Sequence, residues 1–242
     1  MPFVTLNRAA LVTPSPERNR LLAALPSQDY AHVLARLQPV HLRTRQQLAY
    51  PEMPVERVYF PRSAVASMLV LMEDGKLVES AVIGLEGIVG LEVFLGDGLA
   101  RDVILVQISG DAVWMSAASF RAAVGGSVPL QLLLQRYSLA LMNQIVRTAG
   151  CNRIHSVNQR CARWLLMSRD RVGRDDFSLT HEFLARMLGV RRASVSEAAE
   201  GLQRAGLIRY RQGRMQILDG PGLEAAACED YRLSKAAYDQ LY

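Results

Sequence analysis

Cysteine is scarce in this chain of 242 residues, which contains only Cys151, Cys161 and Cys228. Their odd number and wide spacing argue against a disulfide framework and favour a reducing, cytoplasmic location. They also do not form the close cluster that an iron–sulfur sensor needs. Cys151, His155 and Cys161 can be imagined around a metal, but no fourth ligand is evident and the spacing is unusual for zinc. The sequence therefore predicts no metal and no cofactor.

Long apolar runs are also missing. Half of the residues are hydrophobic, yet no run approaches the roughly 20 residues needed to cross a bilayer, so we expect no membrane association. The first residues lack a basic head followed by an apolar core, and so predict no secretion signal.

Histidine is the third scarce residue. A jelly-roll enzyme of the metal-dependent type needs two or more histidines on one pair of strands. The four in this chain, His32, His41, His155 and His181, lie outside the β-rich core expected over 58–115. We therefore expect no catalytic activity.

Positive charge, in contrast, is concentrated in one part of the chain. Residues 1–150 hold 13 basic and 12 acidic residues, a net charge of +1, whereas residues 153–214 hold 13 basic and 6 acidic residues, a net charge of +7. A local basic field favours a polyanion such as nucleic acid. The alternative is a solvated basic face without a partner.

Short β-rich runs separated by turn signals fill residues 57–115. Such runs at close spacing predict an antiparallel sandwich or barrel. We expect short amphipathic helices over 17–37, interrupted by Pro26, before these runs. A short helix over 116–124 should close the domain.

Residues 128–148 have the pattern of a helix with two apolar stripes. The first stripe consists of Leu130, Leu134, Tyr137 and Leu141, and the second of Leu132, Leu139, Met142 and Val146. A helix that is apolar on two sides must bury both. One side can lie on the β domain, and the other needs a partner, most simply the same helix of a second subunit. We assign the first stripe to this dimer interface; the alternative is a central helix buried within one chain.

The C-terminal part has strong local signals. Gly150 and the polar residues after it predict a break, and Ser156 is a plausible N-cap for the next helix. Residues 173–177 read as a loop, and residues 207–218 as a hairpin about Gln212-Gly213. Residues 221–242 read as one final amphipathic helix, in which Cys228 is a small buried hydrophobe.

Two short helices between Thr180 and Gly206, joined by a tight turn at Gly189, predict a helix-turn-helix. A helix that enters the major groove needs small side chains near the wall and a few long ones for base edges. The predicted DNA contacts are Thr180, Arg191, Arg192, Ser194, Ser196 and Glu197. Of these, Arg192 and Glu197 read bases, while Thr180, Arg191 and Ser194 position the helix on phosphates. The alternative is a helical hairpin that binds no nucleic acid.

The order of β-rich domain, long helix and helix-turn-helix with hairpin resembles the Crp/Fnr transcription regulators. The resemblance covers residues from about 18 to 220 and is tightest in LTHEFLARMLGVRRASVSEAAEGLQRAGLIR. It implies an α+β fold with an N-terminal jelly roll of the cyclic-nucleotide-binding type over 18–126. A central dimerisation helix over 127–154 and a winged helix-turn-helix over 155–220 follow, and residues 221–242 complete the chain. The implied partners are double-stranded DNA with a two-fold operator, a second copy of the chain and RNA polymerase.

The reading face departs from the family pattern. The family's recognition helix often has an arginine before a glutamate, and a second arginine four positions beyond that glutamate. Arg192 matches the first arginine, but Ala193 stands at the glutamate position and Glu197 at the second arginine. We therefore expect an operator unlike that of the best-known members.

The effector region also departs from the family. Members that bind cyclic AMP use a glycine–glutamate–leucine turn and an arginine–serine pair; here Gly90 and Arg101 fit, and Glu92 lies one place late. Asp102 replaces the serine and would repel a phosphodiester. The effector is therefore unidentified and not expected to be cyclic AMP, and Arg101 and Asp102 pair more simply with neighbours. A different function remains open: a cyclic-nucleotide-type ligand-binding module whose C-terminal domain docks protein.

Overall fold

The computed structural model describes residues 19–242. Its N-terminal part is built from two antiparallel sheets. One sheet has the strand order β1-β7-β3 and the other the order β2-β6-β4-β5. The strands are β1 (Gln38–Leu42), β2 (Gln47–Ala49), β3 (Arg57–Pro61), β4 (Val65–Leu71), β5 (Leu77–Ile83), β6 (Val103–Ile108) and β7 (Gly110–Ser116). The expected β-rich runs are confirmed, whereas the sequence does not predict β1 and β2. These two strands contain polar residues, and most of their side chains are half-buried or exposed, so they lack a clear alternation of buried and exposed residues.

Short helices flank these sheets. They are α1 (Arg20–Ala23), α2 (Ser27–Leu34), α3 (Glu92–Leu95) and α4 (Ala117–Gly125). Pro26 interrupts the helical region, as the sequence predicts, and stands at the N-cap of α2. The side chain of Ser116 accepts a hydrogen bond from the Ser119 amide and so begins α4 directly after β7.

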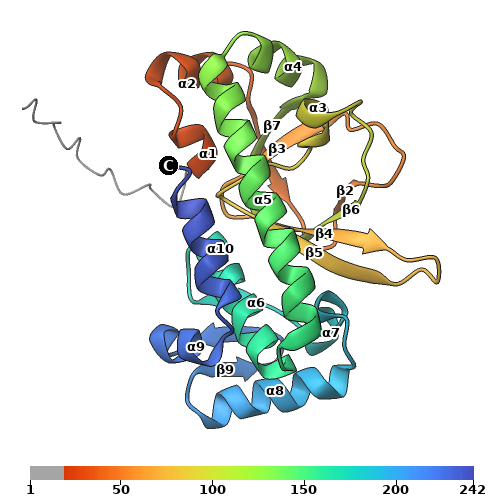
Figure 1. Ribbon diagram of the computed structural model, residues 1–242, viewed down its shortest axis with the longest axis vertical. Coiled ribbons are helices and arrows are strands. Elements are labelled where there is room, and N and C mark those ends of the chain that lie inside the picture. The colour runs from red at the N-terminus through yellow and green to blue at the C-terminus, as the bar shows by residue number, and fades with distance from the viewer. Residues whose placement is uncertain (1–18) are drawn as a thin grey trace, which may run out of the picture.

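Helix α5 (Val128–Ile154) runs along the middle of the molecule, with helix α10 (Asp230–Asp239) beside it (Figure 1). It does not break at Gly150 but continues to Ile154, and the chain turns at His155. Gly150 lowers the intrinsic preference for helix by only about 1 kcal/mol, which the packed residues before and after it offset. The predicted break is therefore in the right region but five residues too early.

The two stripes of α5 have opposite environments. Leu130, Leu134, Tyr137 and Leu141 are buried in the core formed with the β domain and the N-terminal helices. Leu132, Leu139, Met142 and Val146 are exposed. The assignment of the first stripe to a dimer interface is therefore wrong, because elements of its own chain already cover it.

The C-terminal part begins with three helices and a small sheet. They are α6 (Val157–Val172), α7 (His181–Leu188) and α8 (Arg192–Arg204), with β8 (Asp176–Ser178), β9 (Ile208–Arg211) and β10 (Arg214–Ile217) in the order β8-β10-β9. The hairpin turns at Gln212 and Gly213, both with positive φ, as predicted. The expected loop over 173–177 is partly wrong, because its last residues pair with β10 as β8.

The chain ends in two helices rather than one. Helix α9 (Gly220–Ala226) and α10 are separated by Ala227, Cys228 and Glu229. The prediction of a single final helix is therefore wrong. Ala227 has an extended backbone and ends α9, and Leu223 and Tyr231 pack into the core of the C-terminal part on either side of the break.

The sheet that contains β4, β5 and β6 packs directly on the C-terminal helices. Val65, Leu69 and Val82 share one core with Trp164 and Leu165 of α6. The Trp164 indole N–H donates a hydrogen bond of 2.8 Å to Glu79 on β5. The two parts are therefore joined by apolar contacts and by buried polar groups.

Within residues 19–242, no single helix has the length and apolar character needed to cross a membrane. Only α4 and α5 taken together, bent by 112°, meet that criterion of length and composition.

Candidate nucleic-acid interface

Helices α7 and α8 and the turn between them are held by local interactions. The Thr180 hydroxyl accepts a hydrogen bond of 3.2 Å from the Phe183 amide and begins α7. Gly189 ends α7 in the left-handed conformation with φ of 63°, which glycine adopts at little cost. Ala185, Val195 and Leu202 lie in the core beneath the two helices. The predicted helix-turn-helix is therefore confirmed in its geometry.

The N-terminal end of α8 presents positive charge. Arg191 and Arg192 are exposed, and neither forms an ion pair with another residue of the described chain. Arg191 is the N-cap and makes no side-chain capping bond, so the side chain leaves the first amides of the helix free. Free amides and the helix dipole both favour phosphate at this end.

Among the other predicted contacts, Glu197 is exposed one turn further along α8 and Ser194 is half-buried. Ser196 is engaged within the protein, because its hydroxyl lies 3.0 Å from Nδ1 of His181. The His181 ring stacks on Tyr210 at 4.2 Å, and burial lowers the pKa of His181, with a further contribution from Arg192. His181 of α7 therefore connects Ser196 of α8 with Tyr210 of the hairpin.

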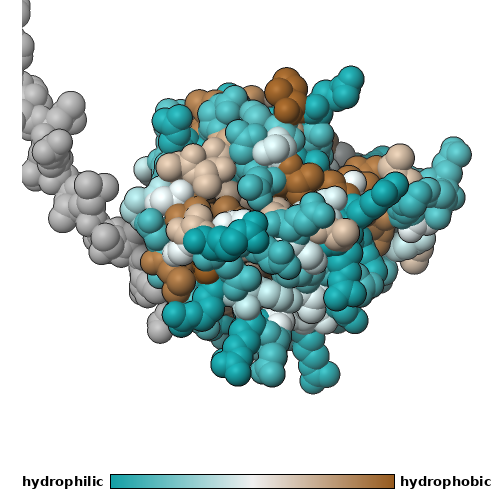
Figure 2. All heavy atoms as spheres, turned by 90° about the horizontal axis from the view of Figure 1, so that it is seen from below, coloured by the Kyte–Doolittle hydropathy of each residue, from teal (hydrophilic) through white to brown (hydrophobic). Residues whose placement is uncertain are grey.

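The hairpin adds cations that the sequence prediction did not include. Arg209, Arg211 and Arg214 are exposed on β9 and β10. Helix α8 lies at one end of the molecule (Figure 1), and Figure 2, which looks onto that end, shows mostly hydrophilic side chains projecting from it. The excess of arginine in residues 207–214 is the signal from which these cations could have been predicted.

Part of the basic excess is not at the surface. Arg160, Arg163 and Arg171 of α6 are buried. Arg171 forms an ion pair of 2.9 Å with Glu86 and donates to Gln144 at 2.8 Å, and Arg160 donates to the Leu188 carbonyl. The net charge of residues 153–214 therefore overstates the charge that a polyanion can contact.

The expected effector residues Gly90, Glu92 and Arg101 each have a role or a contact within the chain. Gly90 has a φ of 98°, a conformation that favours glycine. A Cβ atom at this position would lie only 3.2 Å from the Arg57 carbonyl oxygen, so the local backbone is sufficient to explain the glycine. Arg101 is paired with Asp97 at 2.7 Å and Glu52 at 3.5 Å. The pairing expected for Arg101 is therefore present, and no ion pair is found for Asp102 in the described chain.

Acidic groups gather at the same place. Burial raises the pKa of Glu92, and the nearby Asp102 carboxylate raises it further, while Arg101 lowers it. Burial also raises the pKa of Asp102. Two carboxyl groups beside Arg101 disfavour a phosphodiester at this point.

The comparisons with known proteins agree with this geometry. Residues 159–226 match the Crp-like helix-turn-helix domain. Among solved structures, FixK2 from Bradyrhizobium japonicum is 17% identical with a TM-score of 0.67, covering 79% of this chain and 98% of that one. The c-di-GMP responsive global regulator CLP from Xanthomonas campestris is 17% identical with a TM-score of 0.62, covering 79% and 99%.

A transcriptional regulator of the CRP/FNR family from Thermus thermophilus is 19% identical with a TM-score of 0.59, covering 78% of this chain and 98% of that one. No curated protein matches the sequence. The fold is that of the Crp/Fnr proteins, and its C-terminal domain is a Crp-like helix-turn-helix.

Proposed function

We propose that the protein is a cytoplasmic homodimer that recognises a two-fold DNA operator, with the N-terminal end of α8 in the major groove. The observation that carries this proposal is the pair of exposed, unpaired arginines at the start of an uncapped helix, Arg191 and Arg192. An arginine there can make a bidentate contact with guanine, and Glu197 can accept a hydrogen bond from cytosine N4. Thr180, Arg191 and Ser194 would then hold the helix on phosphates.

We further propose that dimerisation uses the second stripe of α5. Leu132, Leu139 and Val146 are spaced seven residues apart, and Met142 lies between them on the same face. Their exposed fractions, 50% for Leu132 and 63% for Leu139, are high for leucine. A heptad seam of this kind pairs two copies of one helix around a two-fold axis.

We assign sensing or scaffolding to residues 18–126, dimerisation to 127–154 and DNA binding to 155–220. We do not expect cyclic AMP to be the effector, because Glu92 and Asp102 lie beside Arg101. RNA polymerase is a further expected partner by analogy with the family.

Selection of random DNA duplexes by the purified full-length protein tests the DNA-binding proposal. We expect selected sites with two-fold symmetry and half-site centres about 34–36 Å apart, one helical turn. Asymmetric or random sequences would contradict the placement of α8.

The dimer is tested separately by sedimentation of the Leu139→Glu variant. We expect a folded monomer that has lost operator binding, since a charge in the seam opposes pairing. Leu95→Glu is the matched control, because Leu95 is equally exposed, at 60%, but lies on α3. A monomeric wild type at micromolar concentration would contradict the proposal.

A further inference from the structure

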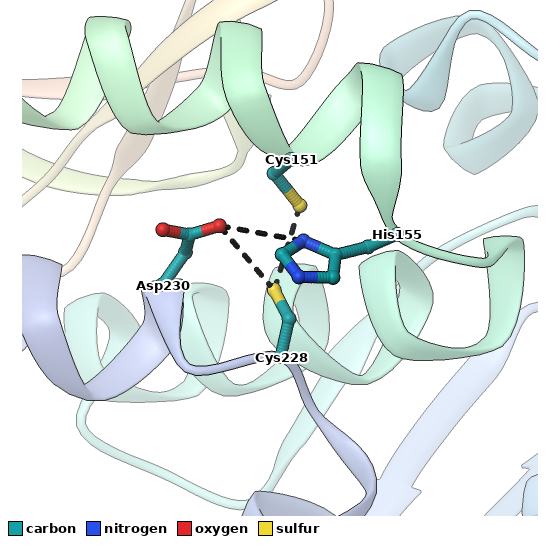
Figure 3. A group of neighbouring side chains, drawn as sticks. All are labelled: Cys151, His155, Cys228 and Asp230. Atoms are coloured by element: carbon teal, nitrogen blue, oxygen red, sulfur yellow. Dashed lines mark hydrogen bonds and ion pairs between the residues drawn. The ribbon is translucent and has the colours of Figure 1, made fainter.

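Four side chains with metal-binding atoms meet where α5 ends and the α9–α10 junction passes beside it. They are Cys151, His155, Cys228 and Asp230 (Figure 3). Cys151 lies in the last turn of α5 and His155 is the C-cap of this helix, and Cys228 and Asp230 flank Glu229 at the start of α10. One ligand atom from each residue lies within 4.8 Å of all the others. None of these residues belongs to the proposed DNA interface.

Three of the distances between these atoms are close to those of a tetrahedron around a zinc ion. The two sulfur atoms are 3.5 Å apart, Cys228 Sγ lies 3.9 Å from Asp230 Oδ2, and His155 Nδ1 lies 3.4 Å from the same oxygen. Zinc bonds of 2.0–2.3 Å place tetrahedral ligands about 3.3–3.8 Å apart. Since all four atoms lie within 4.8 Å of one another, small movements of the side chains would bring them to these distances.

The histidine adds a second observation. Its Nδ1 is buried and directed into the cluster (Figure 3), where it lies 3.4 Å from Asp230 Oδ2 but makes no hydrogen bond with the described residues. The other ring nitrogen, Nε2, lies 3.3 Å from a carboxylate oxygen of Glu229. Histidines that bind metals through one nitrogen commonly donate the other N–H to a carboxylate. A buried ring nitrogen without a hydrogen bond is otherwise costly.

The surroundings complete the site. Arg147 donates to the other carboxylate oxygen of Asp230 at 3.2 Å, which leaves Oδ2 for the cluster. Two thiolates and one carboxylate carry a charge of −3, so Zn²⁺ leaves −1 beside the Arg147 cation. A cleft lined by residues including Gly150, Ile154 and His155 gives access from the surface.

We propose that Cys151, His155, Cys228 and Asp230 bind one Zn²⁺, or a divalent transition metal of the same class. Mixed sulfur, nitrogen and oxygen ligands with tetrahedral spacing favour zinc over the oxygen-preferring Mg²⁺ and Ca²⁺. The ion links the end of α5 and the turn into α6 with the start of α10. It thereby fixes the direction in which the helix-turn-helix leaves α5, a regulatory consequence that rests on the proposed DNA-binding function.

The test uses full-length protein that has been reduced, freed of metal with a chelator and titrated with Co²⁺. We expect one equivalent to produce visible d–d bands and a near-ultraviolet thiolate charge-transfer band, both removed by an equivalent of Zn²⁺. Cys151→Ala and Cys228→Ala should abolish these bands. Cys161→Ala is the matched control and should retain them, because Cys161 is buried in α6 away from the cluster.

Two further variants keep the test decisive if a cysteine variant does not fold. Glu229→Gln should weaken Co²⁺ binding by about 10- to 100-fold through the orientation of His155, and Asp230→Asn should lower the affinity at least as much. In wild type, saturating Zn²⁺ should raise Tm by about 5–10 °C. Circular dichroism verifies that each variant is folded.

Three results would overturn the proposal. They are the absence of stoichiometric Co²⁺ binding by the reduced wild type, bands that persist in a folded Cys228→Ala variant, and a Cys151–Cys228 disulfide whose reduction yields no metal binding. Operator binding is measured on the same samples and should fall at least tenfold on metal removal. A protein that shows the Co²⁺ bands but selects no DNA sequence would contradict the proposed function and leave the metal site supported.

Discussion

Leucine on α5 and arginine in the C-terminal part each occur in two settings. Leu134 is fully buried against the β domain, whereas Leu139, less than two turns further along the same helix, is 63% exposed. Arg171 is buried with Glu86, whereas Arg191 and Arg192 are exposed and unpaired within the described chain. The inward set holds the two parts of the molecule together, and the outward set is free to contact a second chain or DNA. Residue type alone does not separate the two sets.

The largest effect is expected from the inward arginine. Arg171→Ala leaves the buried Glu86 carboxylate without its partner and removes the hydrogen bonds to Gln144 and the Met167 carbonyl. Breaking one partner of a buried pair costs about 3–5 kcal/mol. Urea unfolding measures this loss. Arg191→Ala is the outward control and should change the free energy of unfolding by about 0.5 kcal/mol or less. Equal losses of unfolding free energy in the two variants would contradict the distinction between the buried and the exposed arginine.

The inward leucine comes next. Leu134→Ala opens a cavity in a core that includes Phe60, Phe120 and Leu130, and should lower the free energy of unfolding by about 2–5 kcal/mol. Leu139→Ala should be less stable than wild type only at protein concentrations at which the wild type dimerises. The reason is that this substitution weakens dimerisation rather than the fold of one chain. Unfolding measured at two concentrations separates these cases. A loss below about 1 kcal/mol for Leu134→Ala would count against its burial.

The sequence predicts features that depend on neighbouring residues better than features that depend on how distant elements pack. Ser116, Ser156, Thr180 and Gly189 can be recognised in the sequence because a cap or a left-handed turn depends on residues within a few positions. The face of α5 that turns inward depends on how the β domain docks, and both stripes contain the same residue types. The predicted DNA contacts of α8 are largely exposed, as the local pattern of apolar and polar residues in this helix indicates. The contact of Ser196 with His181, in contrast, depends on how α7 and α8 pack together.

The proposed metal site shows the other limit. Cys151 and Cys228 are 77 positions apart, and the pairing depends on a break between α9 and α10 that the sequence does not signal. The sequence predicts Cys228 to be a small buried hydrophobe, and it is buried. Proximity in sequence suggests Cys161 as the companion of Cys151, although Cys161 lies in the core of the C-terminal part. Long-range ligand sets of this kind require the fold.

A third inward group, Glu79, gives a pH-dependent effect. Burial raises its pKa to about 7, although Ser67 and Trp164 lower it. The Ser67 hydroxyl lies 2.7 Å from both Glu79 Oε2 and Gln107 Oε1 but has one proton. Gln107 uses its amide N–H for Ser168, so its oxygen is the acceptor, and Glu79 donates to Ser67 when it is protonated.

The folded pKa of Glu79 therefore lies above its usual value of 4.5. Its stabilising contribution is present below about pH 4.5 and is lost as the pH rises through about 7, a total of about 3 kcal/mol. Glu79→Gln keeps an amide N–H for Ser67 and should remove this component. The difference in free energy of unfolding between wild type and variant should change between pH 5 and pH 8. Glu197→Gln is the exposed control, and a constant difference for Glu79→Gln would refute the assignment.

The smallest effects are expected from the outward arginines on DNA. Arg192→Ala should cost about 1–3 kcal/mol at one base position in each half-site and relax the preference there. Arg191→Ala should weaken binding to all sequences alike and reduce the salt slope by about one unit for each phosphate that the variant no longer neutralises. The two variants change charge equally and lie side by side, so each is the control for the other. Binding curves on a selected operator and its single-base variants, at several salt concentrations, distinguish the two phenotypes. If Arg192→Ala leaves the base preference unchanged, α8 does not read bases through this residue, and the outward arginines contribute only a general attraction for the DNA backbone.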